Sequence, residues 1–379
     1  MNHKKLSAVL VALLATASAF VPLGTADAAY RFSDFQGRPP VHVYKSAQLK
    51  PSGVSPAEIK KVYNLPATGG KGTIAIIDAY DDPNMESDLA VFDKQYNLPA
   101  CTAANGCFEK HKMASSTASD SGWAMETSLD VEWAHAIAPT AKILLVEAKT
   151  PSGANLLSAI DYATSRKDVI AISMSWGGAE FSDELSYDTH FVDKANPAAA
   201  FFASSGDDGA GASWPASSPN VIGVGGTSLA LASSGALIAE SAWSGSGGGV
   251  SAYEKEPVWQ TAYKISKAGG MRAIPDVSYD ADPASGYSIY ITTGTGAKAK
   301  GVWDTVGGTS AGAPQWAAIQ ALGGSAVLAR FYSDKASTST LKYFRDITSG
   351  SNGACAYYCD ARKRYDYVTG LGSPQTTKF

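Results

Sequence analysis

A serine in a glycine-rich turn is the first feature of this sequence that could do chemistry. Ser310 lies within residues 307–314, Gly-Gly-Thr-Ser-Ala-Gly-Ala-Pro, just before a stretch typical of a helix. The free N–H groups and the positive dipole end at a helix start suit an oxyanion, and so favour a nucleophile there. A serine that only caps the helix is the alternative, because serine is a common N-cap residue. The specific string around Ser310 favours the nucleophile.

A serine nucleophile needs a base, and histidine is the usual choice. After residue 28 the histidines are His42, His111, His135 and His190, and none stands in a His-Gly-Thr string, a setting common for a triad histidine. His135 lies within a helical stretch, so we interpret it as a helix residue with ordinary partners. The base must therefore be sought among other residue types.

Two carboxyl groups are the stronger candidates for the base. Glu126 and Asp130 are four residues apart in a helical stretch, residues 123–133, so they share one helix face. Like charges at this spacing repel each other, more strongly where solvent is excluded. A solvated acidic face is the alternative, since helix carboxylates are usually exposed. A costly pair in an apolar helix flanked by tryptophans suggests a functional use.

Apolar β-runs that alternate with helical stretches must position these groups. The runs are nearly continuous in Ile, Val, Leu, Ala and Phe, as expected of strands buried on both faces of a parallel sheet. They cover residues 73–80, 142–148, 169–176, 199–205 and 221–226, with helical stretches near 84–96, 122–138, 153–166 and 182–195. This order predicts a doubly wound α/β sheet. A hairpin over 286–304 and a helix from 310 to about 322 are predicted after it.

Polar residues lie at the carboxyl ends of three of these runs, at the sheet edge where ligands of open parallel sheets bind. They are Asp78, the string Ser-Trp-Gly-Gly at 175–178, and the string Ser-Ser-Gly-Asp-Asp at 204–208. The glycines of residues 175–178 permit close backbone approach, so this string could bind a substrate as an added β-strand. Ordinary turn chemistry is the alternative for residues 175–178 and for Asp78.

The composition is that of a globular protein. The 379 residues are 45% hydrophobic and 17% charged, which excludes a disordered, coiled-coil or collagen-like chain. The formal net charge is -4 and no basic run occurs, so nucleic acid and anionic membranes are poor partners.

The N-terminal residues have the pattern of a secretory signal. Lysines precede an apolar stretch over residues 6–21, and Ala-Asp-Ala at 26–28 fits the small-x-small cleavage pattern. We expect residues 1–28 to be a signal peptide, 29–54 a short lead-in or prosegment remnant, and 55–379 one folded domain. No later run approaches about 18 apolar residues, so we expect no membrane span after signal cleavage. We expect the protein to be secreted and to be a monomer.

The four cysteines form two local pairs in the sequence. We expect disulfides between Cys101 and Cys107 and between Cys355 and Cys359, because an exported chain meets conditions in which disulfides persist. A zinc site is the alternative, but neither pair has the C-x-x-C spacing and no histidine lies at ligand spacing.

Three strings, taken in order, resemble the sedolisin family of serine-carboxyl peptidases. They are Glu-x-x-x-Asp at 126–130, Ser-Ser-Gly-Asp at 204–207 and Gly-Thr-Ser-Ala-x-x-Pro at 308–314. The resemblance extends over roughly residues 55–376, with further strings at 63–66, 243–249, 275–283 and 365–372. It implies a subtilisin-like fold and a peptidase domain over residues 55–379.

The resemblance also implies the role of each catalytic residue. Ser310 would attack a peptide carbonyl, Glu126 would take its proton, and Asp130 would orient Glu126. Asp207, rather than the adjacent Asp208, would line the oxyanion hole, since it directly follows Ser-Ser-Gly. A carboxyl group donates a hydrogen bond only when protonated, and a glutamate base suits acidic medium, so we expect acidic activity on protein or peptide substrates.

One calcium ion is expected near the C-terminus, again from the resemblance. Its ligands would be the side chains of Asp346 and Asp366 and the backbone carbonyls of Ile347, Arg362 and Arg364. Oxygen ligands suit calcium. The two arginines add positive charge where the family usually has glycine, so weak binding is expected.

Two rival functions can be set against this hypothesis. A pepsin-like aspartic peptidase is suggested by Asp-Ser-Gly at 120–122, but that class needs two such triplets in a β-rich chain, and this one occurs once in an α/β pattern. A catalytically retired, secreted binding protein on a peptidase scaffold is the other alternative. The intact set of Glu126, Asp130, Asp207 and Ser310 argues against it.

Overall fold

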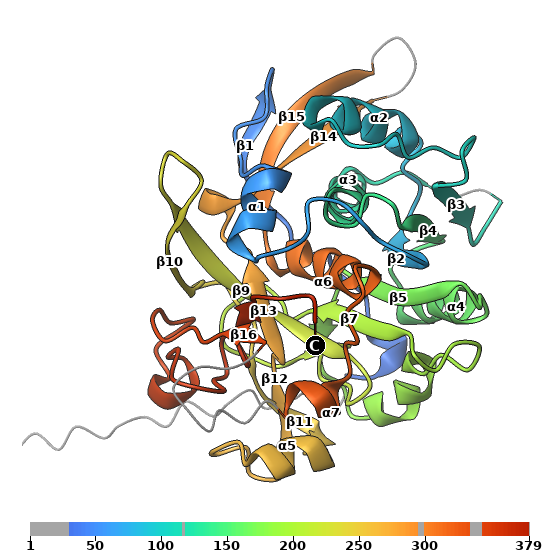
Figure 1. The fold of residues 1–379 in the computed structure, drawn as a ribbon. Helices are drawn as coiled ribbons and strands as arrows, with labels where there is room; N and C mark the ends of the chain where they lie inside the picture. The colour runs from blue at the N-terminus through green and yellow to red at the C-terminus, as the bar shows by residue number, and fades with distance from the viewer. Residues whose placement is uncertain (1–29, 116–117, 295–298, 334–342, 379) are drawn as a thin grey trace, which may run out of the picture.

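A central sheet of eight strands organises the chain (Figure 1). The structure is a computed structural model that describes residues 30–115, 118–294, 299–333 and 343–378, so the expected signal peptide lies outside the described residues. The strand order is β10-β9-β7-β5-β2-β4-β3, with β13 also paired to β9. The strands are β2 (Thr73–Ala79), β3 (Phe108–Lys112), β4 (Lys142–Ala148), β5 (Val169–Met174), β7 (Ala200–Ser204), β9 (Ile222–Leu231), β10 (Leu237–Ala242) and β13 (Val277–Asp280).

All pairs of this sheet are parallel except β9 with β10. β2 is buried along its whole length, and its successive residues face opposite layers. Ile74 and Ile76 belong to the apolar core that includes the helices α2 (Met85–Tyr96), α3 (Ser121–Ile137) and α6 (Gly312–Ala321). Ala75 and Ile77 belong to the core that includes α4 (Gly153–Thr164). The predicted doubly wound, mostly parallel sheet with helices on both faces is confirmed.

The helix α3 crosses the interior rather than the surface. Asp120 caps its start by accepting hydrogen bonds from the N–H groups of Gly122 and Trp123, both at 3.0 Å. From Glu126 to Ile137 every residue is buried, because α2, α6, the central sheet and the strand β14 surround the helix. The alternative of a solvated acidic face for Glu126 is therefore wrong.

A second, three-stranded sheet connects the lead-in to the turn that carries Ser310. Its order is β1 (His42–Gln48), β15 (Lys300–Gly307) and β14 (Tyr287–Thr293), so the hairpin predicted over 286–304 is confirmed. The lead-in strand β1 was not predicted, and it lies beside β15 in Figure 1. β15 continues through Gly308 into a 3-10 turn, η5 (Thr309–Ala311), and then into α6.

The predicted helix over 182–195 is shorter and tighter than expected. It is a 3-10 helix, η2 (Glu184–Phe191). Asp193 accepts hydrogen bonds from the N–H groups of Ala195 and Asn196, and Asp188 accepts one from Ser218. Such side-chain bonds compete with helix formation in this segment.

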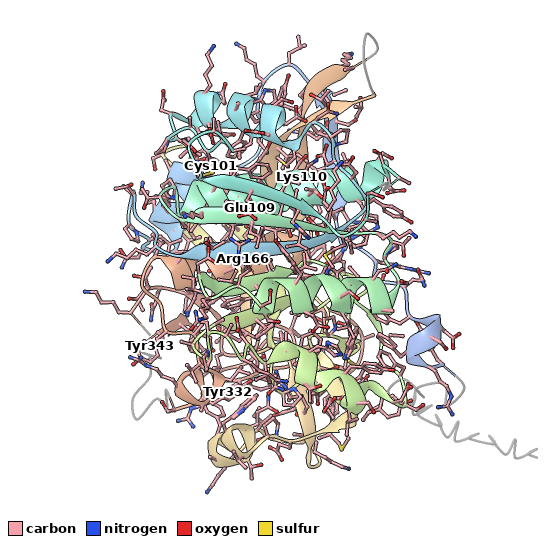
Figure 2. All side chains as sticks on the ribbon, turned by 90° about the vertical axis from the view of Figure 1, so that its right-hand side faces the viewer. Cys101, Glu109, Lys110, Arg166, Tyr332 and Tyr343 are labelled. Carbon is pink, nitrogen blue, oxygen red and sulfur yellow. A yellow bond between two sulfur atoms is a disulfide. The ribbon has the colours of Figure 1, made fainter. Side chains whose placement is uncertain are left out.

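The remaining elements are short and lie between the larger ones. They are η1 (Phe32–Asp34), α1 (Pro56–Val62), β6 (Gly178–Ala179), β8 (Ser213–Trp214), β11 (Gly249–Lys255), α5 (Val258–Tyr263), β12 (Met271–Ile274), η3 (Pro283–Ser285), α7 (Leu328–Phe331), β16 (Phe344–Arg345), η6 (Ala356–Tyr358) and β17 (Ser373–Pro374). At the sheet edge Arg166, just after α4, pairs with Glu109 of β3 at 2.8 and 3.1 Å (Figure 2). No helix among the described residues is long and apolar enough to cross a membrane.

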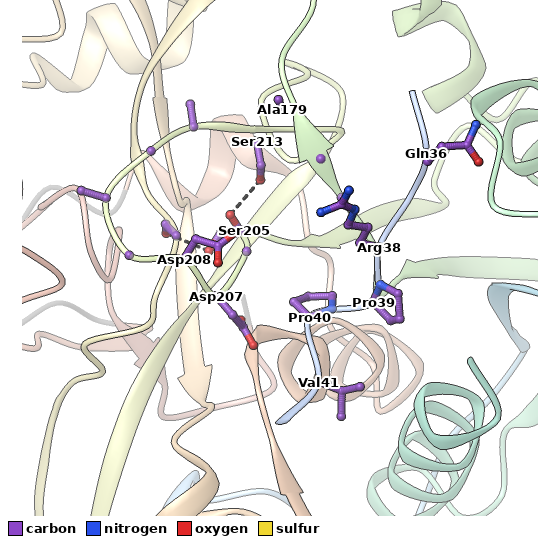
Figure 3. A pocket seen from close by; sticks show the side chains of 18 of the residues that line it. Gln36, Arg38, Pro39, Pro40, Val41, Ala179, Ser205, Asp207, Asp208 and Ser213 are labelled. Carbon is purple, nitrogen blue, oxygen red and sulfur yellow. Dashed lines mark hydrogen bonds between the residues drawn. The ribbon is translucent and has the colours of Figure 1, made fainter. Parts of the chain in front are cut away.

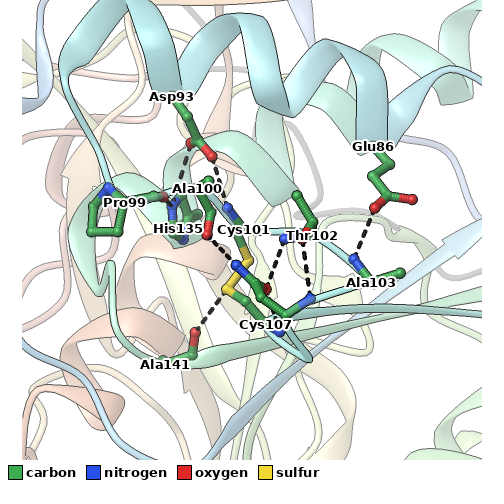
Figure 4. The surroundings of a disulfide bond; sticks show 11 residues. Glu86, Asp93, Pro99, Ala100, Cys101, Thr102, Ala103, Cys107, His135 and Ala141 are labelled. Atoms are coloured by element: carbon green, nitrogen blue, oxygen red, sulfur yellow. Dashed lines mark hydrogen bonds and ion pairs between the residues drawn. A yellow bond between two sulfur atoms is a disulfide. The ribbon is translucent and has the colours of Figure 1, made fainter.

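Both local disulfides are present, as predicted. Cys101 is bonded to Cys107 and Cys355 to Cys359. His135 lies close to the first pair, but sulfurs bonded to each other are not thiolate ligands for zinc (Figure 4). The zinc alternative is therefore wrong for this group.

Candidate active site

Ser310 lies at the junction of three elements. The strand β15 ends shortly before Ser310, the turn η5 contains it, and the helix α6 begins two residues after it. Gly308, just before the turn, has a φ of 134°, a backbone conformation that favours glycine. A side chain at Gly308 would also collide with the carbonyl oxygen of Pro40 and with Oδ2 of Asp207. The glycine-rich string thus permits close approach of other chain segments beside the serine.

Glu126 and Asp130 come to Ser310 from α3, which packs directly against η5. Ser310 and Asp130 both lower the pKa of Glu126, as hydrogen-bonding neighbours of its carboxylate do. Neither Glu126 oxygen, however, makes a hydrogen bond of regular geometry, and Ser310 Oγ makes none either. We conclude that the groups are neighbours whose hydrogen bonds are not fully formed, as is common at catalytic sites before substrate binds.

Ser175, just beyond β5, connects the carboxyl pair to the serine. Its hydroxyl lies 2.8 Å from Oδ1 of Asp130, to which it donates, and 3.1 Å from the backbone oxygen of Ser310. One hydroxyl proton cannot serve both acceptors at full strength, and the shorter contact favours Asp130. The sequence pattern suggested that the backbone of residues 175–178 could pair with a substrate strand. It did not reveal that the Ser175 side chain donates a hydrogen bond to the Asp130 carboxyl group.

Burial dominates the electrostatics of the carboxyl groups. It raises the pKa of Glu126 and that of Asp130 well above their ordinary values, and Coulombic repulsion from Asp78 is the next largest cause for both. The pKa of Asp78, at the end of β2, is itself raised to about 7, chiefly by burial. Asp78, Glu126 and Asp130 therefore lie in one solvent-excluded space, in which the protonated form of each carboxyl group is favoured.

Asp207 approaches the same turn from the segment after β7. Its Oδ1 accepts hydrogen bonds from the N–H (2.8 Å) and the hydroxyl (2.7 Å) of Thr309. Burial raises the pKa of Asp207, while His42 and Thr309 act in the opposite direction. Its Oδ2 is thus the oxygen left to face the space beside Gly308.

His42 is the neighbour of Asp207 that sequence reasoning missed. Its Nε2 lies 3.1 Å from Oδ2 of Asp207, and the close contact with this carboxyl group raises the pKa of His42. The contact does not reach regular hydrogen-bond geometry at Oδ2, so we treat it as an ion pair. A possible signal was the alternation Val-His-Val-Tyr at 41–44, which is typical of a strand.

The other histidines take no part in the site. His135 is buried, its Nε2 lies 2.9 Å from the carbonyl oxygen of Pro99, and burial lowers its pKa to about 4. His111, on the edge strand β3, stacks on Tyr162 with ring centroids 3.7 Å apart. The interpretation of His135 as an ordinary helix residue is confirmed.

A cavity of about 720 Å³ opens beside Asp207 (Figure 3). Residues 205–213 and 177–179 form one part of its lining, and Gln36 and residues 38–42 of the lead-in form another. Ser310, Glu126 and Asp130 are fully buried and do not line it. The cavity is therefore adjacent to the serine but separated from it in this state.

The expected calcium ligands lie around one loop, where backbone N–H groups occupy the carboxylate oxygens in this structure. Both oxygens of Asp346 accept from the N–H of Arg364, at 3.0 and 2.9 Å. Asp366 accepts from the N–H of Arg362 at 3.0 Å. The backbone thus presents N–H groups to the carboxylates where calcium would need carbonyl oxygens, such as that of Ile347, to join them.

A buried serine at the start of a helix, faced by carboxyl groups at the edge of a doubly wound sheet, defines a subtilisin-like protein of the serine-carboxyl class. A sequence model of the subtilase family matches residues 111–342. The chain is 29% identical to sedolisin of Pseudomonas sp. (strain 101), over 86% of this chain, and 31% identical to kumamolisin of Bacillus sp. (strain MN-32), over 87%. It spans 60% and 63% of the lengths of these relatives.

The solved structures agree with the sequence comparisons. Pseudomonas sedolisin, a serine-carboxyl proteinase complexed with two molecules of pseudo-iodotyrostatin, superposes with a TM-score of 0.71 at 28% identity, covering 87% of this chain and 96% of the other. The chain belongs to the subtilase family, and its relatives place it with the sedolisins.

Proposed function

We propose that this protein is a secreted serine-carboxyl endopeptidase that hydrolyses peptide bonds at acidic pH. One observation carries the proposal: Ser310, Glu126 and Asp130 are brought together in a buried site, with Ser175 bonded to Asp130. The family relationship supports peptide hydrolysis, since the relative sedolisin is a serine-carboxyl proteinase.

In the proposed acylation step, the Oγ of Ser310 attacks the carbonyl carbon of the substrate. Ionised Glu126 takes the hydroxyl proton as the new C–O bond forms, and the carbonyl electron pair moves onto oxygen. When the tetrahedral intermediate collapses, the C–N bond breaks and Glu126 gives the proton to the departing amine. Water then attacks the acyl-enzyme in the same way, which releases the acid and restores Ser310.

Asp130 and Ser175 would act through Glu126. A protonated Asp130 can donate a hydrogen bond to ionised Glu126 and so hold the base in place. Burial and the neighbouring acids raise the pKa of Asp130, which favours this protonated form. The pKa of Glu126 is lowered by the same contact and raised by burial. The carboxyl pair therefore titrates as a unit. Because burial raises the pKa of Glu126, the base form at acidic pH depends on the contacts with Ser310 and Asp130, which lower that pKa.

Asp207 would donate a hydrogen bond to the developing oxyanion together with the N–H of Ser310. Only the protonated carboxyl can donate, and burial raises its pKa, which favours that form. Because Thr309 donates to Oδ1, the proton is expected on Oδ2, which faces the space beside Gly308. The His42 ring, whose Nε2 lies 3.1 Å from Oδ2, must turn away before the protonated oxygen can donate to the oxyanion. Neutral pH would remove that proton and place a negative charge against the oxyanion.

The test is hydrolysis of a labelled denatured protein in acidic buffer by wild type and by Ser310→Ala and Glu126→Gln. We expect both variants to fold and to lose turnover, since both substitutions remove a reacting group but little volume. A wild-type chain that folds and binds the substrate without cleaving it would favour the retired binding protein instead.

We also propose weak calcium binding at Asp346 and Asp366. The carboxylates lie around one loop, but the N–H groups of Arg362 and Arg364 must turn away before carbonyl oxygens can join them. The free energy needed to reorient these N–H groups, together with the positive charges of the two arginines, lowers the expected affinity for calcium.

A further inference from the structure

The small two-stranded sheet of β6 and β8 forms one wall of the cavity beside Asp207. Gly178 and Ala179 of β6 line this cavity, and so does Ser213 of β8. Ala179 and Ser213 are Cα partners in the antiparallel pair, and both are labelled in Figure 3. A sheet of two strands is marginally stable by itself in water, so contacts from outside the pair must hold this wall in place.

Glu180 ties β6 to the strand β11. It directly follows β6 and is buried. Its carboxyl group accepts hydrogen bonds from the hydroxyl of Ser251 and, at 3.0 Å, from the N–H of Ala252. The hydroxyl oxygen of Ser251 in turn accepts from the N–H groups of Tyr253 and Glu254, at 3.1 and 2.8 Å. With its lone pairs engaged, Ser251 must donate its own proton to Glu180. Both oxygens of Glu180 therefore face a donor, which fits an ionised carboxylate.

Glu184, in η2, contacts the second strand of the wall. Its Oε2 accepts from the N–H of Phe181 at 3.0 Å, and its Oε1 accepts from the hydroxyl of Ser217, just after β8, at 3.3 Å. Glu184 is fully buried, and Glu180 is its hydrogen-bonding neighbour. Burial, and then repulsion from Glu180, raise the pKa of Glu184, so this group holds a proton in acidic medium. The two carboxyl groups thus form a pair with one negative charge, on Glu180.

The surrounding groups favour this single charge. Glu254 is buried, its Oε1 has no hydrogen-bond partner among the described residues, and it repels Glu184. Burial, and then repulsion from Asp188 of η2, raise the pKa of Glu254 to about 8. Arg272 of β12 lowers that pKa, but its guanidinium pairs with Asp276 at 2.6 Å. A second negative charge on Glu184 would therefore meet other acids rather than a free cation.

We propose that Glu180 and Glu184 are positioning residues for substrate binding, as a carboxyl pair with one shared proton that holds both strands of the β6–β8 wall. The inference rests on the proposed function, because it assumes that a peptide binds along this wall. A peptide that adds a strand to Gly178 and Ala179 binds more tightly when their backbone is already ordered. Loosening the wall should therefore raise KM and leave kcat at saturating substrate unchanged.

Two isosteric substitutions of these neighbours should have opposite outcomes. Glu184→Gln replaces a protonated carboxyl group by an amide that can also both donate and accept, so KM should stay close to that of wild type. Glu180→Gln places an NH₂ group against one of two donors, Ser251 or Ala252, so KM should rise roughly ten-fold. Ser251→Ala removes one donor to Glu180 and should raise KM by less. Glu256→Gln, a half-buried glutamate just after β11, is the matched control and should change neither constant.

The kinetic test measures KM and kcat at acidic pH on a labelled denatured protein, with melting curves to confirm that each variant is folded. We expect the rise in KM in Glu180→Gln and Ser251→Ala alone, with the same kcat throughout. A KM that rises equally in Glu180→Gln and Glu184→Gln, or that changes in neither, would overturn the inference. If Glu180→Gln does not fold, the comparison of Ser251→Ala with Glu184→Gln decides in the same way.

Amide hydrogen exchange separates this inference from the proposed function. In a Ser310→Ala background, Glu180→Gln should speed exchange in residues 177–181 and 213–217 and leave β2 protected, whereas Glu184→Gln should leave all three segments protected. Exchange in these segments that Glu180→Gln does not change would refute the positioning role, whether or not the chain is a peptidase. The expected exchange pattern, together with no turnover in any variant that keeps Ser310, would refute only the peptidase.

Discussion

The Asp207→Asn variant tests the oxyanion role most sharply, because it fixes a hydrogen-bond donor at a place where wild type has one only when protonated. Thr309 donates twice to Oδ1 of Asp207, at 2.8 and 2.7 Å. The oxygen of an asparagine can accept both bonds, so its NH₂ group takes the place of Oδ2, beside Gly308. There it also faces Nε2 of His42, with which the charged pair of wild type can no longer form. The variant should therefore fold and keep a donor at every pH.

The expected size of the effect follows from the titration. Asp207 is protonated below its pKa, which burial raises, and it loses its proton as pH rises through that value. Above it the protonated fraction falls about ten-fold per pH unit, equivalent to about 1.36 kcal/mol each. The ratio of kcat for Asp207→Asn to kcat for wild type should then rise about ten-fold per pH unit on the alkaline limb. Asp207→Ala, with no donor, should lose roughly 10²–10³-fold in kcat.

The assay is kcat at saturating substrate, measured from about pH 3 to about pH 8. The acid limb should be the same in wild type and Asp207→Asn, since it belongs to Glu126 and its coupled neighbours. An alkaline limb in Asp207→Asn that coincides with that of wild type would refute the assignment of Asp207. A loss in Asp207→Ala confined to KM would make Asp207 a substrate-binding residue instead.

Three further predictions concern positioning, stability and metal. Ser175→Ala, which removes the donor to Asp130, should lower kcat roughly ten-fold and shift the acid limb of the profile; an unshifted limb would contradict a positioning role. The unfolding free energy in urea should fall as pH rises from about 4 to about 7, because the folded state holds protons on buried carboxyl groups that the unfolded chain releases near their ordinary pKa of about 4. Greater stability at about pH 7 would contradict this prediction. Burial raises the pKa to about 7 for Asp78, Asp93, Glu147 and Asp366. Calcium at about 10 mM should raise Tm slightly relative to chelator in wild type and not in Asp366→Asn, whereas equal shifts in both would place the ion elsewhere.

The sheet and the buried carboxyl pair were predictable because their signals are local. Strands that are covered on both faces, such as β2 and β5, are continuous apolar runs in the sequence, and the spacing of Glu126 and Asp130 follows from the helix period. The glycines around Ser310 predict the turn in which it lies. Each of these signals lies within a few residues of the feature it predicts.

The positions of residues 35–41 and of β1 were not predictable in the same way. The Cα partner of His42 is Gly307, and such long-range pairing leaves no local signal. Phe35 stands in a polar stretch, and its complete burial depends on Trp176 and Trp214, far along the chain. The roles of Ser175 and His42 likewise depend on neighbours that only the folded chain brings to them.

The pH profile of kcat for the wild-type chain on a labelled denatured protein tests the central claim most directly. If Glu126 is the base and Asp207 the oxyanion donor, the profile is bell-shaped with its maximum on the acid side, and activity is lost by neutral pH. A histidine base would instead gain activity as pH rises through about 6.5. Full activity at about pH 8 with little at about pH 4 would contradict the assignment of Glu126 and Asp130, and would return the search for the base to the histidines.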